Sequence, residues 1–210
     1  MEVDRPGPGE ELNEGPETNA RLAASVIILR DSDAGPEVLL LQRNPVSRFM
    51  GGAWVFPGGA VHADDGDDAA APANAALRET IEEAGITFPS TDALIPFSRW
   101  ITPAQVKIRF DTWFFVARAP ADDTPTIDDA EVVAARWLRP VDALDEYARE
   151  ELLLVFPTIK HLEELAGFES VDDAVATARA RDVQPIQPRV LVDGDTARVL
   201  LPGEPGYEDA

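Results

Sequence analysis

The chain has 210 residues, 45% of them hydrophobic, which is enough for one domain with a sizeable core. Its formal net charge of -21 argues against nonspecific binding to nucleic acid or to an anionic membrane, because both require basic surfaces. The absence of cysteine excludes disulfide and thiolate chemistry and is compatible with the cytoplasmic location that we expect. No apolar run reaches the roughly 20 residues of a membrane span.

The first 20 residues are acidic and rich in proline and glycine, which predicts a disordered tail before a single domain at 21–210. They lack the basic start and apolar stretch of a secretory signal. Runs of β-branched and apolar residues then predict strands at 21–30, 37–43, 53–56, 92–101, 107–118 and 131–138. Near the end, two strand-like runs flank an Asp-Gly turn, which predicts a terminal β-hairpin within 188–203.

One helix is predicted among the strands and three after them. Pro72 and Gly85 bracket the first helix, at 73–84, as first-turn proline and terminal glycine. The others are predicted at 141–150, 157–168 and 170–182, the last capped by Ser170. This order indicates an α/β or α+β domain with a mixed sheet, in which the helices within 140–181 either wall a pocket or form a homodimer contact.

The first helix carries three glutamates within the run ALRETIEEAGI, residues 76–86. Glu79, Glu82 and Glu83 are spaced to project together, and their mutual repulsion calls for something that offsets it. We expect the opposite, apolar side of the helix to pack on the sheet through Leu77, Ile81 and Ala84. Converging carboxylates suit a hard divalent cation, Mg²⁺ or Mn²⁺, although a merely solvated acidic face is the alternative.

The segment before the helix strengthens the metal hypothesis. WVFPGG places Pro57, Gly58 and Gly59 after a short strand, and the two glycines let the backbone approach a ligand closely. A strand, a glycine-rich loop and an acidic helix in this order predict a site for phosphate and metal.

The combination GG…RETIEEAGI resembles the signature of the Nudix hydrolases, G-x5-E-x7-R-E-U-x-E-E-x-G-U with U apolar. The matching residues are Gly59, Arg78, Glu79, Glu82, Glu83, Gly85 and Ile86. The spacing from glycine to arginine is five residues longer than in the signature. Six positions after Gly59 stands Asp65 where the family has glutamate, so Asp65 is our choice for that acid, and the extra residues are expected to form a flap beside the metals.

The resemblance implies an α/β/α sandwich around a mixed sheet, with extra C-terminal helices and the terminal hairpin. It implies that Glu79, Glu82 and Glu83 bind the metals, with the carbonyl of Gly58 and with Asp65, and that Arg78 orients Glu79. It also implies hydrolysis of a nucleoside diphosphate linked to another group, by attack of water on phosphorus. For the general base, Glu79 and the acids of the loop ADDTPTIDDAE, residues 121–131, remain alternatives: Asp122, Asp123, Asp128, Asp129 and Glu131.

A longer series of segments is similar to a subgroup that includes the peroxisomal coenzyme A diphosphatases of animals: SRFMGGAWVFPGGAVHADD, RETIEEAGI, RWITP and RFDTWFFVA. This similarity favours coenzyme A or acyl-CoA as substrate, cleaved to phosphopantetheine and adenosine 3′,5′-bisphosphate. ADP-ribose, NADH or another nucleotide is the alternative within the class. A Nudix module that binds a nucleotide without hydrolysing it is the alternative outside it, and the three retained glutamates weigh against it.

Several other residues are weighed for a role in substrate binding. Arg43 and Arg48 precede the glycine loop and are suited to a substrate phosphate, with surface ion pairs as the alternative. Arg109 and Asp111 indicate either an internal ion pair or a substrate contact. We expect no role for His62 and a surface position for His161. Five aromatic residues suit either the core or stacking on an adenine: Trp54, Trp100, Trp113, Phe114 and Phe115.

Overall fold

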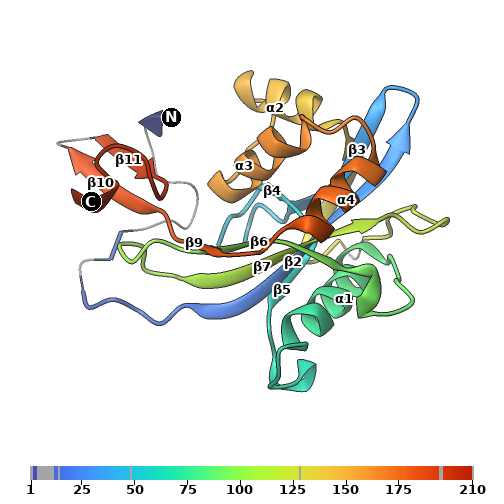
Figure 1. Ribbon diagram of the computed structural model, residues 1–210, viewed down its shortest axis with the longest axis horizontal. Coiled ribbons are helices and arrows are strands. Elements are labelled where there is room, and N and C mark those ends of the chain that lie inside the picture. The colour runs from blue at the N-terminus through green and yellow to red at the C-terminus, as the bar shows by residue number, and fades with distance from the viewer. Residues whose placement is uncertain are drawn as a thin grey trace.

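The computed structural model describes residues 2–3, 12–13, 15–47, 49–127, 129–193 and 196–209 (Figure 1). The strands are β1 (Glu2–Val3), β2 (Arg21–Ser32), β3 (Gly35–Arg43), β4 (Trp54–Val55), β5 (Gly58–Ala60), β6 (Ile95–Ile101), β7 (Phe110–Arg118), β8 (Val132–Leu138), β9 (Pro185–Ile186), β10 (Arg189–Asp193) and β11 (Thr196–Leu200). The α-helices are α1 (Ala71–Ala84), α2 (Pro140–Ala148), α3 (Phe156–Leu165) and α4 (Val171–Ala180). Short 3-10 helices span η1 (Ala63–Asp65), η2 (Thr91–Ala93) and η3 (Tyr207–Asp209).

The main sheet is mixed, as predicted. Its strands follow the order β4-β3-β2-β7-β6-β9, with β5 paired to β2 and β8 paired to β3. The central pair β2–β7 and the edge pair β6–β9 are parallel, and the other pairs are antiparallel. Helix α1 covers one face of this sheet, whereas α2, α3 and α4 cover the other (Figure 1).

Alternation along β2 divides the core into two layers. Ile27 and Leu29 point to the side of α3 and α4, and Val26 and Ile28 point to the side of α1. All four are 0 or 1% exposed, so the strand is buried on both faces and reads as a continuous apolar run rather than an alternating one. The predicted α/β/α sandwich is therefore confirmed.

A second, smaller sheet lies beside the main one (Figure 1). It has the order β1-β11-β10, and β10 and β11 form the predicted terminal hairpin. Of the predicted tail at 1–20, residues 1, 4–11 and 14 lie outside the described part. In the described part, Leu12 pairs with Val106 and the backbone N–H of Asn13 donates to Gln105 at 2.7 Å, so the disorder stays a prediction only for the rest.

The bounds of the predicted elements agree closely with the structure, but three short strands were missed. Gly85 ends α1 in the left-handed conformation, at φ 65°, and Ser170 accepts the backbone N–H of Asp173 at 3.2 Å to cap α4. The missed strands are β5, a Gly-Gly-Ala run predicted as loop, β1 in the predicted tail, and β9 before the terminal hairpin. No helix in the described ranges is long and apolar enough to cross a membrane.

The face of α1 that contacts the sheet differs from the prediction at Ile81, whereas Ala84 is buried in the core and Leu77 packs against it as predicted. Glu79 and Glu83 are only 8% and 5% exposed, whereas Ile81 is 48% exposed. Small residues fill the side toward the sheet: Ala75, Ala76, Thr80 and Ala84. The helix therefore approaches β2 and β5 closely and turns two carboxylates inward, which the expected apolar face through Ile81 would not allow.

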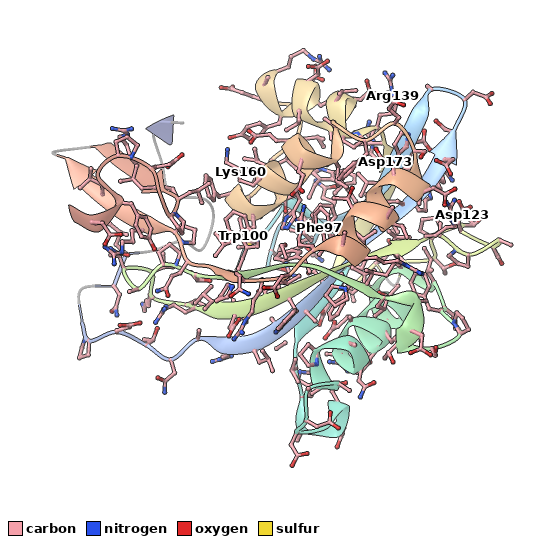
Figure 2. All side chains as sticks on the ribbon, in the orientation of Figure 1. Phe97, Trp100, Asp123, Arg139, Lys160 and Asp173 are labelled. Carbon is pink, nitrogen blue, oxygen red and sulfur yellow. The ribbon has the colours of Figure 1, made fainter. Side chains whose placement is uncertain are left out.

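His161 is buried rather than on the surface. It is 2% exposed in α3, and its Nε2 lies 2.6 Å from Oγ of Ser98 on β6. Rings of the core surround it, among them Phe97 and Trp100, which Figure 2 places between the sheet and the helices. Burial lowers the pKa of His161 to about 3, because the charged form loses its hydration. The backbone carbonyl of Pro157 acts in the opposite direction. Nδ1 of His161 has no hydrogen-bond partner among the described residues.

Stability should therefore fall as the pH falls below about 6.5, the ordinary pKa of histidine. In that window the unfolded chain binds a proton at His161 and the folded chain does not, so the free energy of unfolding decreases by up to about 1.4 kcal/mol per pH unit. We expect the unfolding free energy of His161→Gln, measured with urea between pH 7 and 5, to depend on pH less steeply than that of the native protein, by that amount. The native protein, measured in parallel, is the reference. Equal dependence of the unfolding free energy on pH in the native protein and in His161→Gln would contradict this account.

Candidate active site

The guanidinium of Arg78 binds three carboxylates at once. Its Nε and Nη2 donate to the two carboxylate oxygens of Asp65, at 3.0 and 2.9 Å. Its Nη1 donates to Glu79 at 2.6 Å and to Glu82 at 2.9 Å, and Nη2 also reaches the carbonyl of Ala60 at 3.1 Å. These bonds raise the pKa of Arg78 and lower that of Asp65, with the Asp65–Arg78 hydrogen bonds as the largest cause in both. One cation thus offsets much of the repulsion on α1.

Asp65 holds the guanidinium of Arg78 in place. It stands in η1, and its Oδ2 also accepts the backbone N–H of His62 at 2.8 Å. Both oxygens accept from Arg78, so the arrangement supports an orienting role, and nothing in the described structure supports the predicted role of metal ligand. The five extra residues, 66–70, come after Asp65. They are exposed and line neither cavity of the site, so the flap beside the metals stays a prediction without support from these cavities.

The two glycines of β5 let the backbone pass against the glutamates. A Cβ on Gly59 would lie 2.5 Å from Oε1 of Glu79, and a Cβ on Gly58 would lie 2.3 Å from the carbonyl oxygen of Ala24. The N–H of Gly58 donates to Oε2 of Glu83 at 2.9 Å. Any larger side chain at either position would displace a carboxylate or the neighbouring strand. The predicted metal contact of the Gly58 carbonyl stays a prediction.

Glu83 is the most deeply buried of the three helical glutamates. Burial raises its pKa to about 7, because the charged form loses its hydration. The Gly58 N–H and the charge of Arg43 act in the opposite direction, while Glu79 and Glu131 add to the rise. A carboxylate in such surroundings is poised to accept a cation, since the cation would restore the charged form.

Four glutamates line a small cavity of about 210 Å³, which we call the carboxylate pocket: Glu79, Glu82, Glu83 and Glu131. A set of carboxylate oxygens alone fits Mg²⁺ or Mn²⁺, which prefer hard oxygen ligands, better than it fits zinc or copper. Within the described ranges, no three acidic or histidine side chains stand in a finished ligand arrangement. The reason is visible in the hydrogen bonds, since Arg78 holds Glu79 and Glu82 toward itself.

A larger cavity of about 530 Å³, the main cavity, includes the same four glutamates in its wall. Arg43 and Arg78 line it near the helix. The remaining lining is largely apolar, from the sheet, the start of α3 and the small sheet, and it also includes Arg21, His62 and several hydroxyl side chains. The start of α3 contributes Phe156 and Pro157, so the prediction that the C-terminal helices wall the pocket is supported. The homodimer contact stays a prediction.

The predicted substrate-binding arginines differ in their positions. Arg43 lines the main cavity, and its Nε is buried with no hydrogen-bond partner among the described residues. Arg48 lies outside the described residues. Arg109 is 6% exposed, lines neither cavity and forms an ion pair with Glu17, while it donates to the carbonyl of Thr18 at 2.6 Å. The internal ion pair is therefore the alternative that the structure shows for Arg109, and the substrate contact is not supported.

Some of the remaining candidate acids and aromatic residues line a cavity of the site, and others do not. Asp111 pairs with Arg99 at 2.6 Å, and Asp123 pairs with Arg30 at 3.1 Å. Asp128 lies outside the described residues, and Asp122 and Asp129 are exposed and line neither cavity. Glu131 is thus the acid from this loop that reaches the carboxylate pocket. Of the aromatic residues that suit adenine stacking, Trp100 and Phe114 line the main cavity, whereas three do not: Trp54, Trp113 and Phe115.

Asp65→Asn should destabilise the protein by about 2 kcal/mol, because it removes the charge that Arg78 binds through two hydrogen bonds. The matched control is Asp64→Asn, a neighbouring exposed acid, which should change the free energy of unfolding by no more than about 0.5 kcal/mol. Urea titration at pH 7 measures both. A loss in Asp65→Asn no larger than that in the control would show that Arg78 does not depend on this carboxylate.

Known proteins share this architecture. The NUDIX domain model matches residues 19–158. Acyl-coenzyme A diphosphatase NUDT19 from Homo sapiens is 32% identical over 126 residues, which is 57% of this chain and 33% of that protein. Putative nudix hydrolase 7 from Caenorhabditis elegans is 27% identical over 188 residues, 72% of this chain and 62% of that protein. The chain thus spans about a third of the length of the human relative and less than two thirds of the length of the Caenorhabditis elegans relative.

Solved structures agree with the sequence matches. A NUDIX hydrolase from Alicyclobacillus acidocaldarius superposes with a TM-score of 0.70 at 27% identity, over 76% of this chain and 96% of that one. The NUDIX domain of NrtR from Shewanella oneidensis, solved with ADP ribose, shares the fold at a TM-score of 0.54 and 18% identity, over 70% of this chain and 86% of that one. With the domain model covering most of the chain and the carboxylate cluster in place, the chain belongs to the Nudix family.

Proposed function

We propose that this chain is a Nudix hydrolase that uses divalent metal to cleave a nucleoside diphosphate linked to another group, with coenzyme A or an acyl-CoA as the favoured substrate. The observation that carries the proposal is the position of the carboxylate pocket. All four of its glutamates also line the main cavity, so a cation held there would meet a molecule bound in that cavity.

The metal ligands would come from α1, with the carbonyl of Gly58 as a further oxygen. Glu79 and Glu83 are fixed by the contact of α1 with β5, and Glu82 is more exposed, with 56% of its side-chain surface accessible. A bound divalent ion would neutralise the diphosphate and lower the pKa of the attacking water. Because the formal charge of the chain is -21, such neutralisation is also what would admit an anionic substrate.

The chain's own groups would position the reactants. Arg43 presents a guanidinium to the main cavity beside Glu83, which suits a phosphate oxygen of the substrate. Glu131 is placed to accept the proton that the water loses when its oxygen bonds to phosphorus and the bridging P–O bond breaks. Arg78 would keep Glu79 oriented through the reaction, because Asp65 holds the guanidinium from its other side.

The choice of coenzyme A rests on two kinds of support. The first is similarity to a protein named acyl-coenzyme A diphosphatase, at 32% identity over 126 residues. The second is the main cavity itself, which is large enough for a substantial part of a ligand and is mostly apolar beyond the charged residues. Such a lining favours a substrate with an apolar portion over one that is polar throughout.

The purified protein should hydrolyse coenzyme A or an acyl-CoA in the presence of Mg²⁺ or Mn²⁺, and excess EDTA should stop the reaction. Mass spectrometry should identify phosphopantetheine, or its acyl form, and adenosine 3′,5′-bisphosphate. The test panel also contains ADP-ribose, NADH, diadenosine polyphosphates and nucleoside triphosphates. Glu83→Gln should lower kcat at least about 100-fold, because ligand loss exceeds the effect of an outer-shell change.

The matched control for Glu83→Gln is Glu169→Gln, an exposed glutamate that lines neither cavity and should leave kcat unchanged. Cleavage of a different panel member would keep the hydrolase and reject the coenzyme A substrate. Binding of a nucleotide without cleavage, with either metal, would reject the enzyme and favour the non-catalytic module.

A further inference from the structure

The terminal hairpin contributes an apolar wall to the main cavity. Pro188, Val190 and Val199 line the cavity, although they lie beyond residues 19–158 that match the family domain. Val190 and Val199 are directly paired across β10 and β11, so their side chains share one face of the hairpin. Both are half-buried, and neither belongs to the two hydrophobic clusters that hold the main sheet between its helices.

The other face of the hairpin is covered by the end of the chain. The next pair along the ladder is Arg189 and Leu200, which points away from the Val190–Val199 face. Leu200 is 3% exposed, and Arg189 donates to the carbonyl of Tyr207 at 2.8 Å and lies over its ring at 4.5 Å. The hairpin is thus anchored through one face and presents aliphatic side chains to the cavity with the other.

Further aliphatic residues line the same cavity. Leu12 and Ile108 are 43% and 40% exposed, so their apolar surface is accessible to a bound ligand. Leu12 is held in place by its bridge to Val106, which also lines the cavity. The three hairpin residues in the lining carry no side-chain hydrogen-bonding group, so this region fits an aliphatic chain better than a nucleobase, whose polar edges would stay unpaired.

We propose that the hairpin face formed by Val190 and Val199 binds the acyl chain of an acyl-CoA and sets the chain length that the enzyme prefers. This inference rests on the proposed function, because the cavity joins the hairpin to the carboxylate pocket in one continuous space. The diphosphate lies at the glutamates, and the acyl end of the substrate lies against the hairpin. Free coenzyme A has no group to occupy this wall and is the weaker substrate.

The test is a chain-length series of free, butanoyl-, hexanoyl-, octanoyl- and dodecanoyl-CoA, followed as kcat/KM for adenosine 3′,5′-bisphosphate release. For the native protein, each methylene buried against the wall raises kcat/KM about fourfold, until the cavity is full. Val199→Phe fills the cavity from the hairpin side, so it lowers kcat/KM for octanoyl-CoA about tenfold and moves the preference to a shorter chain. A circular dichroism spectrum and a urea midpoint equal to those of the native protein show that the variant is folded.

The matched control is Val46→Phe, the same change at a valine that is 86% exposed and lines neither cavity, and it keeps the native chain-length profile. The double variant Val190→Ala with Val199→Ala, which removes bulk instead of adding it, flattens the profile if the hairpin is the wall. An unchanged profile in both hairpin variants overturns the inference and leaves the hydrolase intact. Failure to cleave any member of the series, including free coenzyme A, overturns the proposed substrate and this inference together.

Discussion

The contact between Arg78 and three carboxylates is the interaction on which the site depends. Two glutamates of α1 lie against the sheet at under 10% exposure, where unpaired charges would be costly. Arg78 reaches Glu79 and Glu82 with one nitrogen and Asp65 with the other two. Arg78 thus offsets much of the crowded like charge on α1 before any metal binds, and among the described residues it holds Glu79 and Glu82 toward itself rather than in a finished ligand arrangement.

The rest of the local structure follows from bringing α1 so near the sheet. Gly58 and Gly59 leave no Cβ between the backbone of β5 and the glutamates. Small residues on the same side of the helix allow the approach. The five extra residues are tolerated because they follow Asp65, so the acid keeps its distance along the chain from Gly59, and the loop that they form stays on the surface. A long loop costs little free energy relative to a disturbed arginine contact.

Much of this was predictable from the sequence, because the helix and strands are signalled by local patterns. Spacing and the resemblance to the signature singled out the glycine pair, the acids of α1 and Asp65. The structure brings these residues together around Arg78 and β5, and their role in metal binding stays a prediction. The burial of Glu79 and Glu83 was not predictable, since periodicity favoured Ile81 as the buried residue and could not weigh how closely small residues let the helix approach. The positions of Arg109 and His161 depend on partners that are distant in the sequence. Glu17, which pairs with Arg109, lies 92 residues away, and Ser98, which contacts His161, lies 63 residues away.

The central claim is that the glutamates of α1 bind divalent metal, and direct binding tests it without any substrate. Mn²⁺ titration followed by electron paramagnetic resonance measures the bound fraction in the native protein and in Glu79→Gln. We predict saturable binding to the native protein and an affinity at least about tenfold weaker in the variant. Equal affinity in the two proteins, or no binding to the native protein, would contradict the account, because the carboxylate pocket would then not be a metal site.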